Sequence, residues 1–256
     1  MRQFGLIGYP LTHSFSKEYF TEKFEREHIW DARYDLFPLG KIEEFPFLAK
    51  AVSNLVGLNV TIPHKETIIK YLDEIDPIAK AVGAVNVVKL ENGKSIGFNT
   101  DLYGFEQSLM SWFRRMYQAK IFTRPVQQAL ILGTGGAAKA IEYVCTEKMF
   151  MNSRFVSRNP ASDKQITYEE CESFMQDYAE PTLIVNCTPL GTFPSIEQAP
   201  ALNYNLLRPE FYLYDLVYNP ELTVFMQKGI DKGCYVKNGL EMLHLQAEKS
   251  WEIWNR

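Results

Sequence analysis

The sequence predicts an α/β protein of two units, and two observations lead to that prediction. First, short apolar segments flanked by turn residues alternate with helical segments along the chain, a pattern typical of a mostly parallel sheet covered by helices. Second, the pattern restarts near residue 129 after a long helical segment, and a chain of 256 residues is long enough for two ordinary domains.

Four apolar segments are expected to form strands of the first unit. They are Phe4–Gly8, Tyr34–Phe37, Val56–Val60 and Ala84–Val88, with helical stretches between the first three. A hairpin turn at Asn92-Gly93 is then expected between residues 87–90 and 95–98, because Asn-Gly readily adopts the positive φ angles of a tight turn. We expect this hairpin to form an antiparallel edge of the first sheet.

The second unit begins after a helix that we expect from about Leu102 to Tyr117. Its predicted strands are Ala129–Leu132, Arg154–Ser157, Leu183–Asn186 and Tyr212–Leu216. At the end of the chain, apolar residues recur at spacings of three and four from Leu240 to Trp254, which indicates one buried helix face. We expect this last helix to pack on the first unit.

Composition narrows the class of protein. Hydrophobic residues make up 46% and charged residues 23%, which are ordinary values for a globular protein, and the net charge of −4 offers no electrostatic attraction to nucleic acid. No apolar run reaches the roughly 20 residues of a membrane span, and the chain starts directly in a strand instead of a signal peptide. Its four cysteines form no C-x-x-C pair. We therefore expect a cytoplasmic protein without a metal, a disulfide or a nucleic-acid partner.

A glycine-rich loop, Gly133-Thr134-Gly135-Gly136-Ala137-Ala138, directly follows a predicted strand and opens a helix expected over residues 139–148. In this context a G-x-G-x-x-A pattern is typical of dinucleotide binding. The backbone amides of Gly133, Gly135, Gly136 and Ala137 can approach a pyrophosphate, where the helix N-terminus favours an anion. A glycine-rich turn without a ligand is the alternative.

The tip of the next strand indicates which dinucleotide is bound. A protein that binds NAD usually carries Asp or Glu there, whereas this chain has Ser157, Arg158 and Asn159. A guanidinium next to small polar side chains suits a 2′-phosphate, since such a charge-assisted contact contributes ~1.5–3 kcal/mol. NADP is therefore favoured over NAD, with an ordinary surface arginine as the alternative.

One lysine stands in a position suited to proton transfer. In the segment Asn59–Glu66, an apolar strand runs into Pro63, which ends strand pairing and sets a rigid turn before Lys65. An ammonium group held there can donate a proton, although a solvated loop lysine is the simpler reading of this segment alone.

Together these features resemble the shikimate dehydrogenase family, the NADP-dependent enzymes that interconvert 3-dehydroshikimate and shikimate. The resemblance covers nearly the whole chain. It rests on motifs at residues 8–10, 13–16, 59–66, 83–86, 99–104, 133–138, 186–188, 214–218 and 238–246. It implies an N-terminal substrate-binding α/β domain (residues 1–101, completed by the helix 239–256) and a Rossmann dinucleotide-binding domain (residues 102–238).

The resemblance implies a reversible oxidoreductase acting on a CH–OH group in chorismate and aromatic amino acid biosynthesis. Lys65 and Asp101 match the family's catalytic pair. Hydride from NADPH leaves alkoxide character on the ketone oxygen, which Lys65 would protonate while Asp101 orients the lysine and accepts a bond from a substrate hydroxyl. A helix N-cap is the alternative role for Asp101.

Further positions match the family's ligand contacts. The substrate contacts implied are Ser14, Ser16, Asn59, Thr61, Asn86, Tyr218 and Gln246. Those near the ribose and nicotinamide are Thr188, Leu216 and Gly239. Simple capping of the first helix would explain one of the two serines, and a solvated helix face would explain Gln246.

The chain departs from the usual family pattern in three places. Lys17 stands where the family commonly has a proline after the second serine. The family commonly has a second arginine shortly after the first, whereas here Lys164 is the nearest cation after Arg158. The third departure is His64, directly before Lys65, which with His13 places two imidazoles near the implied site. Either histidine could relay a proton, and a solvated side chain is the alternative. The alternatives in function are a quinate/shikimate dehydrogenase that uses NAD and a non-catalytic dinucleotide-binding sensor. We expect a monomer or homodimer.

Overall fold

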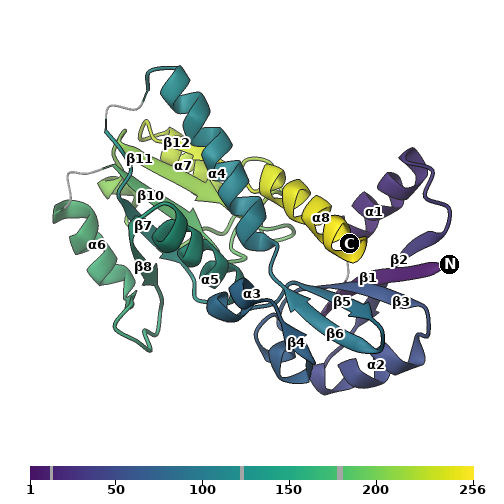
Figure 1. Ribbon diagram of the computed structural model, residues 1–256. Helices are drawn as coiled ribbons and strands as arrows, with labels where there is room; N and C mark the ends of the chain where they lie inside the picture. Colours follow the sequence, from purple (N-terminus) through teal and green to yellow (C-terminus); the bar gives the residue numbers. More distant parts are fainter. Residues whose placement is uncertain (12–13, 122–123, 178–180) are drawn as a thin grey trace. The chain divides into compact units, whose positions relative to one another are not determined.

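The computed structural model describes residues 1–11, 14–121, 124–177 and 181–256 (Figure 1). Backbone contacts divide the chain into two compact units. Met1–Thr100 and Gln246–Arg256 form the first unit, and Asp101–Leu245 form the second. The second boundary therefore falls inside the last helix. Each unit contains one six-stranded sheet.

The sheet of the first unit has the strand order β2-β1-β3-β5-β6-β4. Its strands are β1 (Arg2–Gly8), β2 (Ala32–Pro38), β3 (Leu55–Val60), β4 (Glu74–Ile75), β5 (Val87–Glu91) and β6 (Lys94–Phe98). Its helices are α1 (Phe15–Arg26), η1 (Ile42–Glu44), α2 (Phe45–Ala51), η2 (Thr67–Tyr71) and α3 (Pro77–Val82). Strand β1 pairs in parallel with β2 and β3, β4 pairs in parallel with β6, and β5 runs antiparallel to β3 and β6.

The predicted hairpin is confirmed, but its place in the sheet differs from the expectation. Asn92 and Gly93 adopt φ angles of 53° and 76°, as a tight turn requires. Strand β6 is not the edge, because β4 pairs outside it. Strand β4 has only two residues, too few to show any alternation in the sequence.

The strand predicted over Ala84–Val88 begins later than expected, because β5 starts only at Val87. Asp76 caps α3 by accepting from the backbone of Ile78 and Ala79, and Gly83 ends that helix at φ 72°. Residues 84–86 follow before β5 begins at Val87. The backbone N–H of Val85 donates to the carbonyl of Lys65 at 2.7 Å, so this segment supports the lysine loop.

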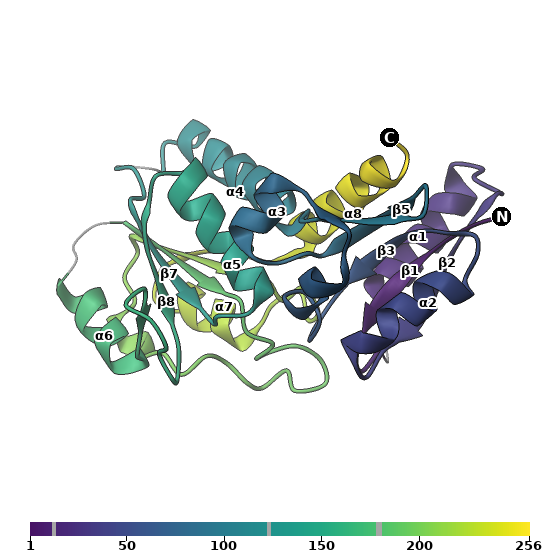
Figure 2. The same ribbon diagram turned by 60° about the horizontal axis from the view of Figure 1, so that its bottom comes forward.

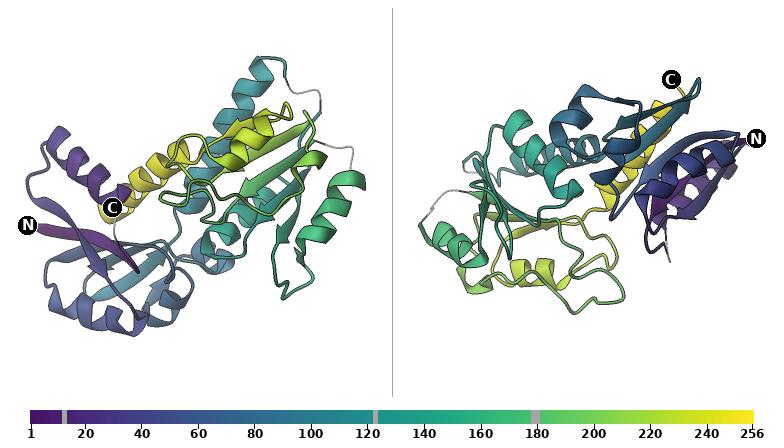
Figure 3. Two further views of the ribbon diagram at one scale, coloured as in Figure 1. Left: turned by 180° about the vertical axis from the view of Figure 1, so that it is seen from behind. Right: turned by 90° about the horizontal axis from the view of Figure 1, so that it is seen from below.

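Both faces of the first sheet are buried. One core cluster packs Ile7, Leu58, Ile68, Ala79 and Val88 with their neighbours from α2, η2 and α3. The other packs Phe4, Phe20 and Tyr34 against the last turns of α8 (Leu240–Trp254), which lie beside this sheet in Figure 3. Trp254 donates its indole N–H to the carbonyl of Val88 at 3.0 Å. Gly57 leaves room for that ring, since a Cβ there would collide with it.

The sheet of the second unit is entirely parallel, in the order β12-β11-β10-β7-β8-β9. Its strands are β7 (Gln128–Leu132), β8 (Asn152–Val156), β9 (Gln165–Ile166), β10 (Thr182–Asn186), β11 (Phe211–Asp215) and β12 (Tyr235–Lys237). Its helices are α4 (Asp101–Gln118), α5 (Gly136–Tyr143), η3 (Val144–Lys148), α6 (Tyr168–Asp177), η4 (Tyr204–Leu206) and α7 (Val224–Ile230).

This order is the doubly wound Rossmann topology. The chain moves outward from β7 to β9, then returns to β10 beside β7 and continues outward to β12. Alternate residues of β11 face opposite layers, because Tyr212 and Tyr214 contact α4 whereas Phe211 and Leu213 belong to the cluster that contains α6 and α7. Figure 2 shows α4 and α5 on one side of this sheet and α7 on the other. Ligands of such sheets bind outside the carboxyl ends of the strands where the order reverses, which here are β7 and β10.

The four strands predicted for this unit are confirmed to within two residues at each end, with the largest difference at the start of β8. The short strands β9 and β12 were not expected. The helix expected over residues 139–148 begins earlier, at Gly136, and its last turn, Val144–Lys148, is π-helical. The last helix has the predicted bounds, Leu240–Trp254. Within the described residues, none of the helices has the length and apolar character needed to cross a membrane.

Candidate functional site

The loop that carries Lys65 is held firmly by its backbone. After β3 ends, the N–H of Thr61 donates to Ile7 of β1 at 2.9 Å, and the N–H of His64 donates back to Thr61 at 2.9 Å. The carbonyl of Lys65 itself accepts from Val85. The lysine is half-buried. Its position is therefore fixed from both neighbouring segments, as the rigid turn at Pro63 led us to expect.

His64 is a buried residue of this loop, which excludes the solvated side chain considered above. Only 3% of its surface is exposed. Its Nε2 lies 2.6 Å from the carbonyl oxygen of Leu39, and its own carbonyl accepts from Ile68 in η2. The ring therefore ties the Lys65 loop to the segment that follows β2. His13 lies outside the described residues.

Three of the predicted substrate contacts meet in one buried polar cluster of the first unit. Asn59 donates to the hydroxyl of Ser250 at 3.1 Å, and Ser250 donates to the backbone carbonyl of Gln246 at 2.8 Å. Thr100 lies 3.2 Å from Ser250. Asn86 donates to the Thr100 hydroxyl at 3.0 Å and accepts from its backbone N–H at 2.6 Å. We call these five residues the Ser250 cluster.

Tyr34 extends the Ser250 cluster toward helix α1. Its hydroxyl donates to Oδ1 of Asn59 at 2.8 Å, and it also shares a hydrogen bond with Ser16. Burial raises the pKa of Tyr34, so it stays a neutral donor. Ser14 is the N-cap of α1 and accepts from the backbone of Lys17 at 3.2 Å. Capping thus accounts for Ser14, while Ser16 points to a different partner.

Sequence reasoning missed Tyr34, Thr100 and Ser250 as members of this site. A signal existed for Ser250, because it lies three residues after Ala247 and four before Trp254, on the face of the last helix that reads as apolar. A small hydroxyl on such a face needs a polar partner when buried, and it is fully buried here. Thr100 belongs to the family motif at residues 99–104, but nothing in the sequence indicated a ligand contact for it.

In the second unit the glycine-rich loop has the geometry of an anion site. Gly133 follows β7 with φ 108°, a conformation that favours glycine. Gly135 is the N-cap of α5, and a side chain there would meet nothing within 4 Å, so its surroundings are open. The first turn of α5, with Gly136 and Ala137, directs backbone N–H groups outward.

The residues after β8 lie at the same edge of the sheet, with Ser157 half-buried and Asn159 exposed. Ser157 donates its N–H to Ile166 of β9 at 2.9 Å, and its hydroxyl accepts from the backbone of Asn159 at 3.2 Å. Arg158 between them is exposed. Lys164, the next cation, lies 3.1 Å from the carboxylate of Glu142 in α5. The two cations therefore differ in their surroundings, because Lys164 already forms an ion pair with Glu142.

Leu216 and Gly239 come together beside the end of β11. The N–H of Gly239 donates to Val217 at 3.2 Å, and a Cβ at position 239 would collide with the carbonyl oxygen of Leu216. Only glycine allows the start of α8 to approach this segment so closely. Tyr218 is half-buried two residues further on.

Asp215, at the end of β11, is a fully buried carboxyl group. It accepts hydrogen bonds from Asn186, from the N–H of Val217 and from the hydroxyl of Thr223, at 2.9, 3.0 and 2.6 Å. Burial raises its pKa to about 6, although these three bonds favour the ionised form. Holding this group ionised in the folded state therefore costs stability at neutral pH.

Asp215→Asn is expected to change the pH dependence of stability. In the wild type, the folded pKa of about 6 exceeds the ordinary value of 3.8, so the contribution of this group is most favourable below pH 3.8 and is lost as pH rises through 6. The loss corresponds to about 3 kcal/mol. The unfolding free energy of the variant, measured by urea denaturation, should thus increase relative to that of the wild type as the pH rises from 4 to 7.

The exposed Asp231→Asn change is the control for that series, and its curve should follow the wild type. Burial raises the pKa values of the neighbouring Cys187 and Tyr204 as well, so neither group titrates between pH 4 and 7. Parallel curves for Asp215→Asn and the wild type would contradict the raised pKa.

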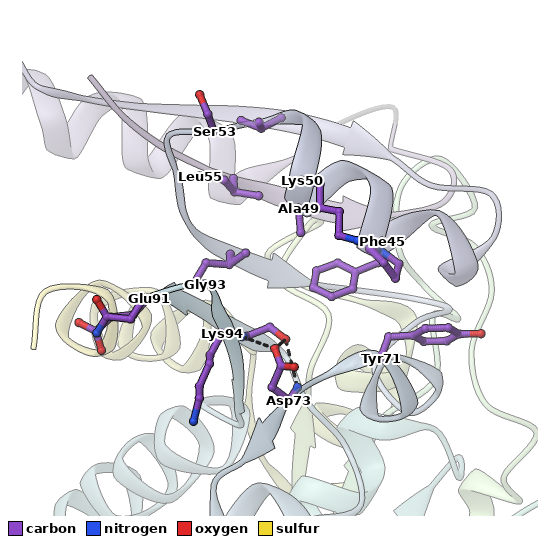
Figure 4. Close-up of a pocket in the computed structure, with 15 residues that line it drawn as sticks. Phe45, Ala49, Lys50, Ser53, Leu55, Tyr71, Asp73, Glu91, Gly93 and Lys94 are labelled. Carbon is purple, nitrogen blue, oxygen red and sulfur yellow. Dashed lines mark hydrogen bonds between the residues drawn. The ribbon is translucent and has the colours of Figure 1, made fainter.

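One pocket of about 520 Å³ lies away from these residues (Figure 4). It is lined by α2, by the β5–β6 turn and by the start of β3, with Phe45, Tyr71 and Lys94 among its side chains. Asp73 accepts from Ser95 beside it. Because β3 starts at this pocket and ends at Asn59 and Val60, the pocket lies at the opposite end of the sheet from the Ser250 cluster.

The remaining predicted residues are placed as follows. Thr61 is half-buried at the end of β3, and Asp101 is the buried first residue of α4, in the second unit. Thr188 packs its methyl group 3.3 Å from the site of a Cβ on Gly133. Within the described parts of the chain, no group of three or more His, Cys, Asp or Glu side chains could hold a metal ion.

Comparisons with known proteins agree with one another. A family model described as the shikimate dehydrogenase substrate binding domain matches residues 6–88. The shikimate dehydrogenase (NADP(+)) of Clostridium beijerinckii is 38% identical over 267 residues, which cover 99% of this chain and 92% of that enzyme. The crystal structure of shikimate dehydrogenase 1 from Peptoclostridium difficile is similar with a TM-score of 0.81 at 34% identity, covering 100% and 92% of the two chains.

A third similar protein was solved with ligands. It is the shikimate 5-dehydrogenase of Thermus thermophilus in complex with NADP(H) and shikimate, at a TM-score of 0.81 and 28% identity, with 99% of this chain and 93% of that chain covered.

Proposed function

Because the chain belongs to the shikimate dehydrogenase family, we propose that Lys65 is the proton donor in an NADPH-dependent reduction of 3-dehydroshikimate to shikimate. The chain is an NADP-dependent oxidoreductase that acts on a CH–OH group. Its reaction is a reversible step of chorismate and aromatic amino acid biosynthesis. The roles of its individual residues are our proposal.

The chemistry assigned to Lys65 follows from the reaction. Hydride transfer from reduced nicotinamide to the C3 ketone places negative charge on the ketone oxygen. A positioned ammonium stabilises that charge and then transfers its proton to the oxygen, a contribution of typically ~10²–10⁴-fold. In the reverse direction the neutral amine accepts the hydroxyl proton. The fixed backbone of the Lys65 loop supports this role, because proton transfer requires a donor held in place.

Asp101 is proposed as the partner of Lys65 in this step. A carboxylate can orient the ammonium group and accept a hydrogen bond from a ring hydroxyl, which aligns the ketone for hydride transfer. The remaining substrate contacts are proposed to be Ser14, Ser16, Asn59, Thr61, Asn86, Tyr218 and Gln246. Amide and hydroxyl side chains suit a small ring that carries a carboxylate and several hydroxyls.

NADP is proposed to lie at the carboxyl edge of the second sheet, where its order reverses. Its pyrophosphate would accept from the N–H groups of Gly135, Gly136 and Ala137, with Gly133 allowing close approach. Ser157, Arg158 and Asn159 would hold the 2′-phosphate, and Thr188, Leu216 and Gly239 would lie along the ribose and nicotinamide. When bound, the cofactor supplies or accepts the hydride.

The main support for this proposal is the Ser250 cluster, which gathers the amides of Asn59, Asn86 and Gln246 in the unit that also holds the Lys65 loop. The side-chain oxygen of Gln246 accepts from the Thr100 hydroxyl at 3.5 Å. Buried amides in a connected network are held in one orientation, and fixed orientation is what recognition of several hydroxyls requires.

A double-mutant cycle of Lys65→Ala and Asp101→Ala tests the proposed pair. Each change alone should lower kcat by ~10²–10⁴-fold. The kcat of the double variant should be no more than ~10-fold below that of the less active single variant, because the effects of residues that act as one unit are non-additive. Binding of NADPH alone, followed by its fluorescence, should stay close to that of the wild type. Fully additive losses in kcat would contradict the pairing.

Replacement of Ser250 by alanine is expected to weaken substrate binding selectively. The change leaves the side-chain N–H of Asn59 buried without its acceptor, which costs ~1–3 kcal/mol. The amides avoid this cost by reorienting, and they then no longer face the substrate in the wild-type arrangement. The KM for shikimate should rise by about 5–50-fold while the KM for NADP stays within twofold. Initial rates with each substrate varied in turn measure both values.

The exposed Ser173→Ala change in α6 is the control for Ser250→Ala and should leave both constants unchanged. Equal rises in both KM values for Ser250→Ala would indicate a general loss of structure.

The cytoplasmic location, the monomeric or homodimeric state and the absence of nucleic-acid and membrane partners remain part of this proposal. Small-molecule ligands alone are needed for the reaction. Cell fractionation and a measurement of the molar mass in solution test these points.

A further inference from the structure

Asp215 is a buried ionisable group for which the reaction provides no role. None of its surface is exposed. Its hydrogen-bond donors are the amide of Asn186, the backbone of Val217 and the hydroxyl of Thr223, and none of these is cationic. A leucine, with the same number of side-chain heavy atoms, would avoid the cost of burying a charge, but it would leave three donors without an acceptor.

The three donors belong to different parts of the carboxyl edge of the second sheet. Asn186 is the last residue of β10, Val217 lies in the segment after β11, and Thr223 is the N-cap of α7. Thr223 also accepts from Met226 at 3.3 Å in its capping role. The carboxylate of Asp215 thus joins the ends of two neighbouring strands to the start of the helix that follows.

Asp215 also determines which way the amide of Asn186 points. An ionised carboxylate only accepts hydrogen bonds, so the NH₂ group of Asn186 must face it. The oxygen of Asn186 is then directed to Thr188, where it accepts from the backbone N–H at 3.0 Å and from the hydroxyl at 2.6 Å. The second proton of that NH₂ group is donated to the carbonyl of Leu190 at 3.3 Å.

The chain of contacts ends at the glycine-rich loop. With its hydroxyl turned to Asn186, Thr188 places its methyl group 3.3 Å from the site of a Cβ on Gly133. On the other side, Val217 is held by Asp215 through its N–H, and its carbonyl accepts from Gly239 at 3.2 Å. The segments after β10 and β11 are therefore linked through one carboxylate, and the first of them lies beside the glycine-rich loop.

We propose that Asp215 is a positioning residue of the dinucleotide site, which fixes the segments carrying Thr188 and Leu216 in the arrangement that receives the cofactor. This inference rests on the proposed function, because Thr188 and Leu216 are cofactor contacts only in that proposal. The carboxylate acts through hydrogen-bond geometry and touches no ligand itself.

Two substitutions at position 215 separate the hydrogen-bond geometry from the negative charge. In Asp215→Asn, the side-chain oxygen still accepts from Asn186 and Val217, and only the contact with Thr223 changes to a donated bond. In Asp215→Leu, both acceptor oxygens are replaced by methyl groups. The Kd of NADPH, from titration of its fluorescence, should rise at least ~10-fold for Asp215→Leu and stay within threefold for Asp215→Asn, since each tenfold step is 1.4 kcal/mol.

The KM for shikimate at saturating NADP is the second readout. It should change by less than threefold in both variants, because the Ser250 cluster belongs to the first unit. Asp231→Leu, at an exposed aspartate that accepts from Gln227 at 2.9 Å, is the matched control and should leave both constants unchanged.

A second pair of variants keeps the inference testable if Asp215→Leu does not fold. Thr223→Val removes the hydroxyl that donates to Asp215 and caps α7, and Thr223→Ser retains both contacts. Thr223→Val should raise the NADPH Kd several-fold and Thr223→Ser should not. A folded Asp215→Leu or Thr223→Val protein with wild-type NADPH affinity would overturn the inference, as would an equal loss in Asp215→Leu and Asp215→Asn. A wild type that binds no NADPH would instead refute the proposed function.

Discussion

Replacing Lys65 with alanine is expected to lower kcat by ~10²–10⁴-fold while the KM for shikimate changes little. The alkoxide that forms on hydride transfer loses the group that stabilises and protonates it, and water must take over. Ground-state binding depends on the ring hydroxyls and the carboxylate, which other side chains contact in our proposal. A loss in kcat without a change in KM is the signature of an interaction made mainly in the transition state.

Lys70→Ala is a matched control, because this lysine is exposed in η2, shortly after the Lys65 loop. It should retain wild-type kcat. Steady-state rates at 340 nm, the absorbance of reduced nicotinamide, measure both variants. A Lys65→Ala enzyme with near-normal turnover would remove Lys65 from the mechanism and leave its loop without an explanation.

Replacing Arg158 with alanine is expected to raise the KM for NADPH by ~10–100-fold and to leave the KM for NADH nearly unchanged. The two cofactors differ by the 2′-phosphate, so only NADPH loses a charge-assisted hydrogen bond. The exposed position of Arg158 after β8 permits this contact without rearrangement of the sheet.

Lys164→Ala provides the comparison for Arg158, because Lys164 already shares its charge with Glu142 at 3.1 Å. We expect its effect on the KM for NADPH to be several-fold smaller than that of Arg158→Ala. If Arg158→Ala raised the KM values of both cofactors equally, the arginine would not recognise the 2′-phosphate.

The long elements of the fold were predictable from the sequence, and the short ones were not. Residues 129–132 and 183–185 are buried on both faces and appear as continuous apolar runs, and the last helix repeats its apolar face over four turns. Strands β4 and β9 have two residues each, so their pairing depends on neighbouring strands more than on any local pattern.

The candidate site was predictable where a residue type stands in a motif, and not where its role depends on a distant partner. Lys65, Arg158 and the glycine loop follow from local sequence. Ser250, by contrast, meets Asn59 across 191 positions of the chain, and Asp215 meets Asn186 across 29. Neither pairing has a local signal, because tertiary structure alone brings these side chains together.

The proposed reaction is tested most directly by the absorbance at 340 nm after the purified protein is mixed with shikimate and NADP. We expect rapid formation of reduced cofactor, with much slower formation when NAD replaces NADP or quinate replaces shikimate. No reduced cofactor with shikimate and NADP, or a clear preference for quinate and NAD, would contradict it.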